Sequence, residues 1–138
     1  MTNKATARRF YDLYNAGDLA AIERELLAPQ ATFSSNGAPL MDVRAYRAFG
    51  QMWRDAFGDL TIDVLDQIEE SDQVVSRLRA RGRHSGELMG LPATGRTIDI
   101  AGISIDRFSE GMLIERSEVY DLFGMMQQLG ALPSSATN

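Results

Sequence analysis

The segment Gly111–Gly130, GMLIERSEVYDLFGMMQQLG, changes from a strand period to a helical period near its middle. In its first half successive residues alternate between two faces, which is the period of a β-strand. One of these faces holds Leu113, Glu115, Ser117, Val119 and Asp121. From Leu122 the apolar residues follow helical spacing, and Gly130 is placed to end that helix. We therefore expect a strand that runs into a short helix, with the Asp121 face pointing into the protein.

Asp121 lies at the predicted junction between strand and helix, and two interpretations of it follow. The first is a helix N-cap, because aspartate is a preferred cap and complements the helix dipole. The second is a carboxylate that faces an apolar cavity. Burial would raise its pKa toward the range in which a carboxyl serves as a general acid and base. One side chain can combine both roles.

The first half of the chain is predicted to be helical. Apolar residues follow helical spacing in residues 7–14, 19–26 and 45–57. Asp18 and Asp42 directly precede the second and third of these stretches, where each can cap a helix. Three amphipathic helices are therefore expected before the main strands.

After residue 58 the period changes to two and stays there. The pattern predicts an antiparallel meander of four strands, at residues 60–64, 74–84, 98–105 and 113–120. A further short strand is expected at residues 31–34. The alternation changes phase at Ala101 and Gly102, which predicts a β-bulge there.

Helices followed by antiparallel strands are typical of an α+β domain. We expect a curved antiparallel sheet wrapped on the N-terminal helices, forming a cone with an apolar cavity for a small ligand. With 138 residues, the chain is expected to form a single domain, residues 1–138.

The composition argues against several functional classes. A net charge of -5 argues against nucleic acid as a partner. Without cysteine, the chain has no thiolate nucleophile and no zinc–thiolate site, and its single histidine gives no imidazole pair for a metal. No phosphate-binding or dinucleotide-binding glycine motif is present. We expect chemistry without cofactor or metal, no signal peptide or membrane partner, and a cytoplasmic location.

The candidate site residues are those on the predicted interior faces. His84 is either a hydrogen-bonded core residue or a catalytic group that orients Asp121 or polarises a carbonyl. Glu115 is either a partner of the many arginines or a second interior carboxylate. The arginines of the second strand are expected to form a solvated outer face. Substrate contacts are expected from Tyr14, Phe33, Trp53, Met89, Glu115 and Ser117, with Trp53 and Met89 as apolar contacts.

Residues 82–133 contain H-x-G-E-x-x-G-x-P-x-T-G-R from His84 and D-x-x-G-x-x-x-Q-L-G from Asp121. With RRFYDLYNAGDL at residues 8–19, they resemble the SnoaL-like polyketide cyclases of the nuclear transport factor 2-like superfamily. The resemblance implies a cone-shaped fold and a homodimer formed through the sheet. It also implies intramolecular aldol closure of an apolar polyketide methyl ester, without metal or cofactor. Asp121 matches the family's catalytic aspartate, which would remove a proton and return one to the new alkoxide.

Residues 115–121 read ERSEVYD where the family has approximately EHWEVWD. Ser117 stands in place of a large interior aromatic residue, and Arg116 in place of a histidine. A serine there enlarges the pocket or adds a hydroxyl to it.

Three other functions remain open for this chain, because the superfamily contains more than cyclases. The cone could bind a small molecule without catalysis, with Asp121 as a cap only, or the protein could be an isomerase. An epoxide hydrolase would need an Asp-Arg-Asp relay in the cavity. Asp99 with Arg96 or Arg107 is available for such a relay, but Asp99 alternates with the apolar face.

Overall fold

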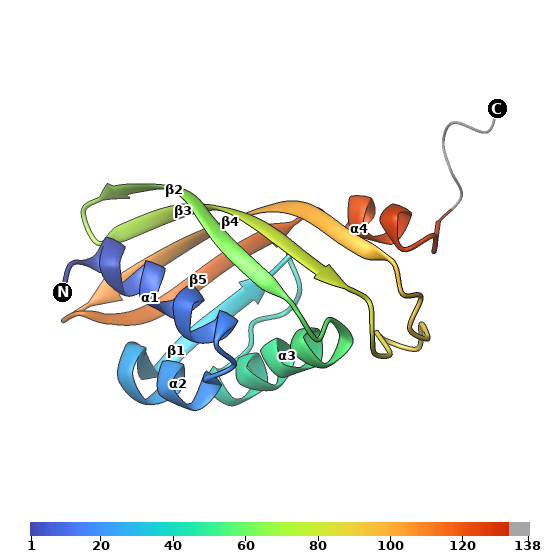
Figure 1. Ribbon diagram of the computed structural model, residues 1–138. Coiled ribbons are helices and arrows are strands. Elements are labelled where there is room, and N and C mark those ends of the chain that lie inside the picture. Colours follow the sequence, from blue (N-terminus) through green and yellow to red (C-terminus); the bar gives the residue numbers. More distant parts are fainter. Residues whose placement is uncertain (133–138) are drawn as a thin grey trace.

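The computed structural model describes residues 1–132, which form four helices and a curved sheet (Figure 1). The elements in chain order are α1 (Asn3–Asn15), α2 (Leu19–Leu26), β1 (Leu27–Ser35), α3 (Val43–Ala56), β2 (Thr61–Glu70), β3 (Gln73–Arg83), β4 (Thr97–Ser109), β5 (Met112–Tyr120) and α4 (Leu122–Gln128). This is the expected α+β architecture. No helix in the described part of the chain has the length and apolarity needed to span a membrane.

The three predicted N-terminal helices are confirmed, and so are two of their caps. The Asp18 carboxylate accepts a hydrogen bond from the Ala21 backbone N–H at 3.1 Å, and that of Asp42 accepts one from Ala45 at 2.8 Å. Each carboxylate satisfies one of the N–H groups that a helix leaves free in its first turn. These caps set where α2 and α3 begin.

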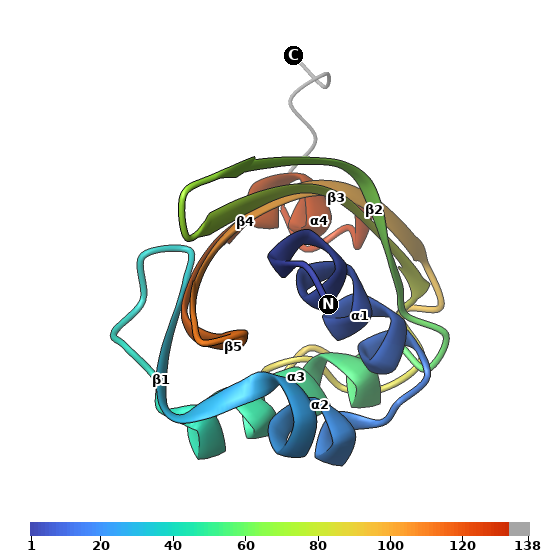
Figure 2. The same cartoon turned by 90° about the vertical axis from the view of Figure 1, so that its left-hand side faces the viewer.

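The sheet has the strand order β1-β5-β4-β3-β2. Strands β2 to β5 form the predicted antiparallel meander, and β1 joins β5 in parallel at the edge. β1 is longer than the short strand expected at residues 31–34. Its pairing joins segments far apart in the chain, so a local period does not reveal it. Figure 2 shows the open sheet curling around α1, with α2 and α3 on the open side.

The β-bulge predicted at Ala101 and Gly102 is absent from β4. The strand pairs with β3 without a register shift, and its residues alternate between buried and exposed from end to end. Ile103 and Ile105 face outward, while Ser104 and Asp106 are fully buried. The prediction was wrong because the interior beside this half of β4 is polar, so apolar side chains do not mark the inner face there.

A register shift that was not predicted lies in β5. Leu113 pairs with Phe108 of β4, whereas Glu115 pairs with the preceding residue, Arg107. One residue of β5, Ile114, is therefore inserted, as in a β-bulge. Beyond it the two faces of the strand are exchanged: Arg116 and Glu118 are buried beside Leu113. Glu115 and Ser117 are exposed, so the predicted interior face of this strand was wrong.

Candidate functional site

A cavity of about 540 Å³ lies between the inner face of the sheet and helices α1 to α3. Its wall is mainly apolar and includes Phe10, Phe49, Trp53, Phe57, Ile98 and Ile100. Exposed lining residues mark its mouth: Ala38 and Pro39 come from the loop before α3, and Met89 comes from the loop between β3 and β4. A cavity of this size and lining fits an apolar small molecule.

Helix α3 presents a row of aromatic side chains to this cavity. Tyr46, Phe49, Trp53 and Phe57 recur at helical spacing, as the sequence predicts, and all four line the cavity. Successive rings of the row have centroids 5.9–6.3 Å apart. The row provides a continuous surface against which a flat conjugated molecule can pack.

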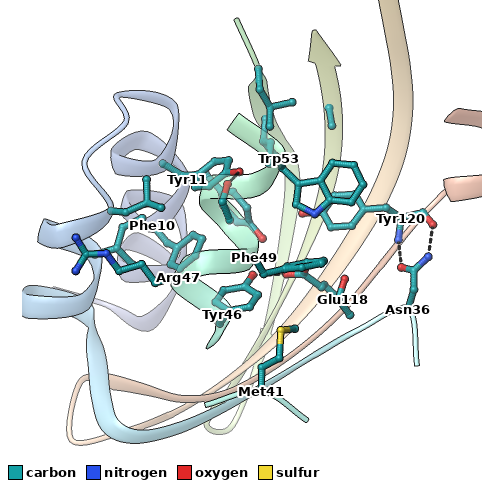
Figure 3. A pocket seen from close by; sticks show the side chains of 18 of the residues that line it. Phe10, Tyr11, Asn36, Met41, Tyr46, Arg47, Phe49, Trp53, Glu118 and Tyr120 are labelled. Atoms are coloured by element: carbon teal, nitrogen blue, oxygen red, sulfur yellow. Dashed lines mark hydrogen bonds between the residues drawn. The ribbon is translucent and has the colours of Figure 1, made fainter. Parts of the chain in front are cut away.

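Glu118 of β5 is the buried carboxylate in the lining of the cavity (Figure 3). Its residue is 6% exposed, and it accepts a hydrogen bond from the Tyr46 hydroxyl. Burial raises the pKa of Glu118, while the positive charge of Arg116 and the hydrogen bond from Tyr46 act in the opposite direction. A buried carboxyl with a raised pKa can take up and return a proton.

A buried ion pair lies on the same inner face, outside the cavity lining. Arg116 Nε is 2.6 Å from Asp106 Oδ1, and Arg116 Nη2 is 2.9 Å from Asp106 Oδ2. The guanidinium carbon lies 3.7 Å from the centroid of the Phe10 ring, a cation–π contact. Tyr11 completes the cluster by donating to the Ser104 hydroxyl at 2.9 Å. The inside of the cone therefore holds an apolar cavity and a polar cluster, and Glu118 lines the cavity while it interacts with the charge of Arg116 in the cluster.

The structure places four of the predicted substrate contacts in or near the cavity. Tyr14, Trp53 and Met89 line it. Phe33 is fully buried behind the lining and stacks on Tyr46 with ring centroids 4.0 Å apart. Phe33 therefore supports the position of Tyr46 from behind.

The other two predicted contacts lie outside. Ser117 is exposed on the outer face of β5, and Glu115 is exposed there with Arg107 Nε at 3.7 Å. Their expected interior placement is wrong because the insertion at Ile114 reverses the faces of the strand. Glu115 therefore matches the interpretation as a partner of an arginine.

Asp121 is exposed and caps α4. Its Oδ1 accepts a hydrogen bond from the Gly124 backbone N–H at 2.8 Å. The N-cap interpretation is confirmed, and the expected interior orientation is wrong. Asp121 lies beside a depression on the outer face of the sheet and does not line the cavity. Its catalytic role stays a prediction.

His84 is fully buried and hydrogen-bonded within the protein. Its Nδ1 accepts a hydrogen bond from the Thr94 backbone N–H at 3.1 Å and lies 3.0 Å from the Thr94 hydroxyl. The ring lies 5.4 Å from that of Phe57 and is outside the cavity lining. Within residues 1–132 no hydrogen bond joins His84 to Asp121, and the surroundings match a core histidine.

The charged residues considered for an epoxide relay also lie on the outer surface. The exposed Asp99 carboxylate pairs with Arg79, and Arg107 pairs with Asp72. Arg96 does not line the cavity. In the described residues no group of three or more His, Cys, Asp or Glu side chains is arranged to hold a metal ion.

Glu118 and Tyr120 are the site residues that sequence reasoning missed. They alternate with Val119 on β5. The period of two therefore predicted the strand correctly, but the wrong face of it was assigned to the interior. Tyr46 was recognised on the buried side of its helix but not as a partner of a carboxylate. No local pattern marks that pair, which is 72 residues apart in the chain.

The comparisons with known proteins agree with the α+β fold. A family model described as SnoaL-like polyketide cyclase matches residues 4–129. Aklanonic acid methyl ester cyclase of Streptomyces peucetius is 30% identical over 128 residues, which cover 89% of this chain and 87% of that protein. The same-named enzyme of Streptomyces sp. (strain C5) is also 30% identical, over 89% of this chain and 78% of that protein.

Solved structures are similar over almost the whole chain. IdmH of Streptomyces antibioticus, a candidate polyketide cyclase, is 31% identical with a TM-score of 0.86, covering 94% of this chain and 99% of that one. AclR of Streptomyces galilaeus, a candidate hydroxylase, is 25% identical with the same TM-score of 0.86, covering 95% and 97%.

Proposed function

The chain belongs to the SnoaL-like polyketide cyclase family, and we propose that it closes a ring of an apolar polyketide methyl ester by intramolecular aldol addition. The observation that carries this proposal is Glu118, a buried carboxylate on the wall of an aromatic cavity, hydrogen-bonded by Tyr46. The family resemblance would assign the proton transfers to Asp121. Because Glu118 faces the cavity and Asp121 faces solvent, we propose Glu118 as the acid and base.

In the proposed reaction the Glu118 carboxylate removes a proton from the carbon between two carbonyl groups. The electron pair of that C–H bond moves onto the carbonyl oxygen and gives an enolate. The enolate carbon then attacks a second carbonyl of the same molecule, forming the C–C bond and an alkoxide. The alkoxide takes the proton back from Glu118, so the enzyme returns to its starting state without a co-reactant.

The aromatic row of α3 would supply the other part of the catalysis. An open-chain substrate has to fold so that its two reacting carbons approach each other. Packing of its rings against Phe49 and Trp53 would hold that conformation, and such positioning can replace much of the entropic barrier of ring closure. The apolar lining would also favour an uncharged ester over the free acid.

The experiment is an absorbance assay with an anthraquinone-type polyketide methyl ester, using wild type, Glu118→Gln and Asp121→Asn. Glutamine keeps the size of Glu118 and an acceptor oxygen for Tyr46, but it cannot take a proton. We expect turnover by wild type and Asp121→Asn and none by Glu118→Gln. The reverse order would assign the reaction to Asp121. Binding without turnover by all three proteins would indicate a non-catalytic binding protein.

We also propose the homodimer that the family resemblance implies. The outer face of the sheet exposes Leu65, Ile103, Ile105 and Val119, at 41–56% of their surface. Exposed apolar side chains gathered on one face favour contact with another protein surface. Light scattering should give twice the chain mass, and Ile103→Asp should reduce it to one chain. The cytoplasmic location stays a prediction.

A further inference from the structure

The four tyrosines of the chain all line the cavity, but their hydroxyl groups differ in how they are bonded. Tyr11 donates to Ser104, Tyr14 donates to the Gly50 carbonyl at 2.7 Å, and Tyr46 donates to Glu118. For Tyr120, no group within residues 1–132 hydrogen-bonds the hydroxyl. Tyr120 is therefore the one cavity tyrosine whose donor is free for a ligand within the described part of the chain.

Tyr120 is held in place at its backbone and at its ring. Its backbone N–H donates to Asn36 Oδ1 at 2.8 Å, and its carbonyl accepts from Asn36 Nδ2 at 3.0 Å (Figure 3). The ring lies over Gly102 of the neighbouring strand β4. A Cβ atom at Gly102 would be only 2.4 Å from Tyr120 Cδ1 and 2.6 Å from Cε1. The ring can take this position across β4 because residue 102 has no side chain.

The Tyr120 hydroxyl remains open to the cavity. Among the described residues, the fully buried side-chain nitrogen and oxygen atoms that lack a hydrogen-bond partner are His84 Nε2 and Arg116 Nη1. The unpaired hydroxyl of Tyr120 is not one of them. Burial raises the pKa of Tyr120 well above its usual value, and the negative charge of Glu118 acts in the same direction. The hydroxyl therefore keeps its proton and remains a donor.

Most other polar side chains of the lining are already engaged, and the exception among the described residues is the indole N–H of Trp53 on α3. Asn36 is used by the Tyr120 backbone, and Arg47 pairs with Glu23 at 2.8 Å. Glu118 offers an acceptor, as a base requires. A bound carbonyl oxygen needs a donor, and among the described residues the unpaired side-chain donor on the same strand as Glu118 and in the cavity lining is the Tyr120 hydroxyl.

We propose that the Tyr120 hydroxyl donates a hydrogen bond to the carbonyl oxygen of an aromatic ketone bound in the cavity, and that Gly102 is a positioning residue for its ring. This inference rests on the proposed function. When Glu118 takes the proton from carbon, the electron pair moves to the oxygen that Tyr120 contacts. The hydrogen bond then strengthens as negative charge develops on that oxygen.

Binding of 9-fluorenone, a tricyclic ketone, and of fluorene, its hydrocarbon counterpart, tests the donor without turnover. We expect Tyr120→Phe to weaken fluorenone binding by about 2- to 10-fold, the range of one neutral hydrogen bond. Fluorene binding should not change. Infrared difference spectra of ¹³C=O-labelled fluorenone should show a lower carbonyl frequency in wild type than in Tyr120→Phe.

Tyr14→Phe is the matched control for the infrared measurement, because the Tyr14 hydroxyl already donates to Gly50. It should leave the carbonyl band at the wild-type frequency. Equal carbonyl frequencies in wild type and Tyr120→Phe would overturn the proposal. So would a wild-type protein that binds neither tricyclic compound, because the donor would then be out of reach of a ketone.

With the cyclisation substrate, Tyr120→Phe should lower kcat by about 10²-fold, the effect of losing one oxyanion donor. The change in KM should be small, because the hydrogen bond is strongest in the transition state. The proposal of Glu118 as the base and that of Tyr120 as the donor can be contradicted independently. Full activity of Glu118→Gln would remove the proposed base, while the carbonyl frequencies would still decide whether Tyr120 is the donor.

Discussion

Glu118 and Asp121 are three residues apart, yet they occupy opposite environments. Glu118 lies on the inner face of β5, where burial raises its pKa and Tyr46 donates to it. Asp121 lies just beyond the end of the same strand, exposed to solvent and bonded to the first turn of α4. The difference shows that the position in the fold, rather than the residue type, decides whether a carboxylate is buried in the cavity lining or exposed to solvent.

The largest effect is expected when the carboxylate is moved by one residue. The double variant Ser117→Glu with Glu118→Ser keeps the composition but places the carboxylate on the outer face of β5. We expect the rate to fall by about 10²–10⁴-fold, the usual contribution of a general base. Initial rates of the absorbance change measure it, and wild-type activity would show that the inner face is not the site.

The next effect concerns the ion pair beside Glu118. Asp106→Asn removes the partner of a fully buried guanidinium, which should lower the free energy of unfolding by about 3–5 kcal/mol. Asp63→Asn is the control, because it removes the partner of Arg81 in an exposed ion pair, where the loss should be at most about 1 kcal/mol. Urea unfolding measures both. Equal losses would contradict the difference between the two faces.

A smaller effect on stability is expected at Asp121, the exposed carboxylate. Asp121→Ala removes the cap of α4 and should lower the free energy of unfolding by about 0.5–2 kcal/mol. Asp121→Ser keeps a capping oxygen and should recover most of that loss. Thermal unfolding of the two variants measures the capping role. A catalytic role would be lost in both variants, since serine does not replace a carboxylate base.

The smallest expected effect is a difference in pH dependence. Because the pKa of Glu118 is raised above its usual value of 4.5, the folded state holds this proton more tightly than the unfolded chain. Its contribution to stability is complete below pH 4.5 and is lost as the pH rises through the folded-state pKa. Over that window, the free energy of unfolding of wild type should fall relative to that of Glu118→Gln. Parallel curves would contradict the raised pKa.

Much of the fold could be predicted from local pattern. The helices, the caps at Asp18 and Asp42 and the four meander strands depend on neighbours within a few residues, which the spacing reveals. The aromatic side of α3 was predicted in the same way, and it became one wall of the cavity. The parallel strand β1 was predicted only as a short segment, because its partner is far away in the chain.

The site was harder to predict, since two local signals pointed the wrong way. Apolar Ile103 and Ile105 face outward while Ser104 and Asp106 are buried, so hydrophobicity did not mark the inner face. In β5, the face that holds Leu113 is the interior one only as far as Ile114, where the inserted residue exchanges the two faces. The first error comes from the polar cluster inside the cone, and the second comes from the inserted residue.

By itself, therefore, the sequence determined the elements, their caps and the α+β class, because these follow from interactions between near neighbours. Only the tertiary structure decided which carboxylate faces the cavity. That choice depends on the pairing of β4 with β5, where one inserted residue exchanges the two faces of the strand. It also depends on Tyr46, which lies 72 residues away in the chain and donates to the buried Glu118 carboxylate.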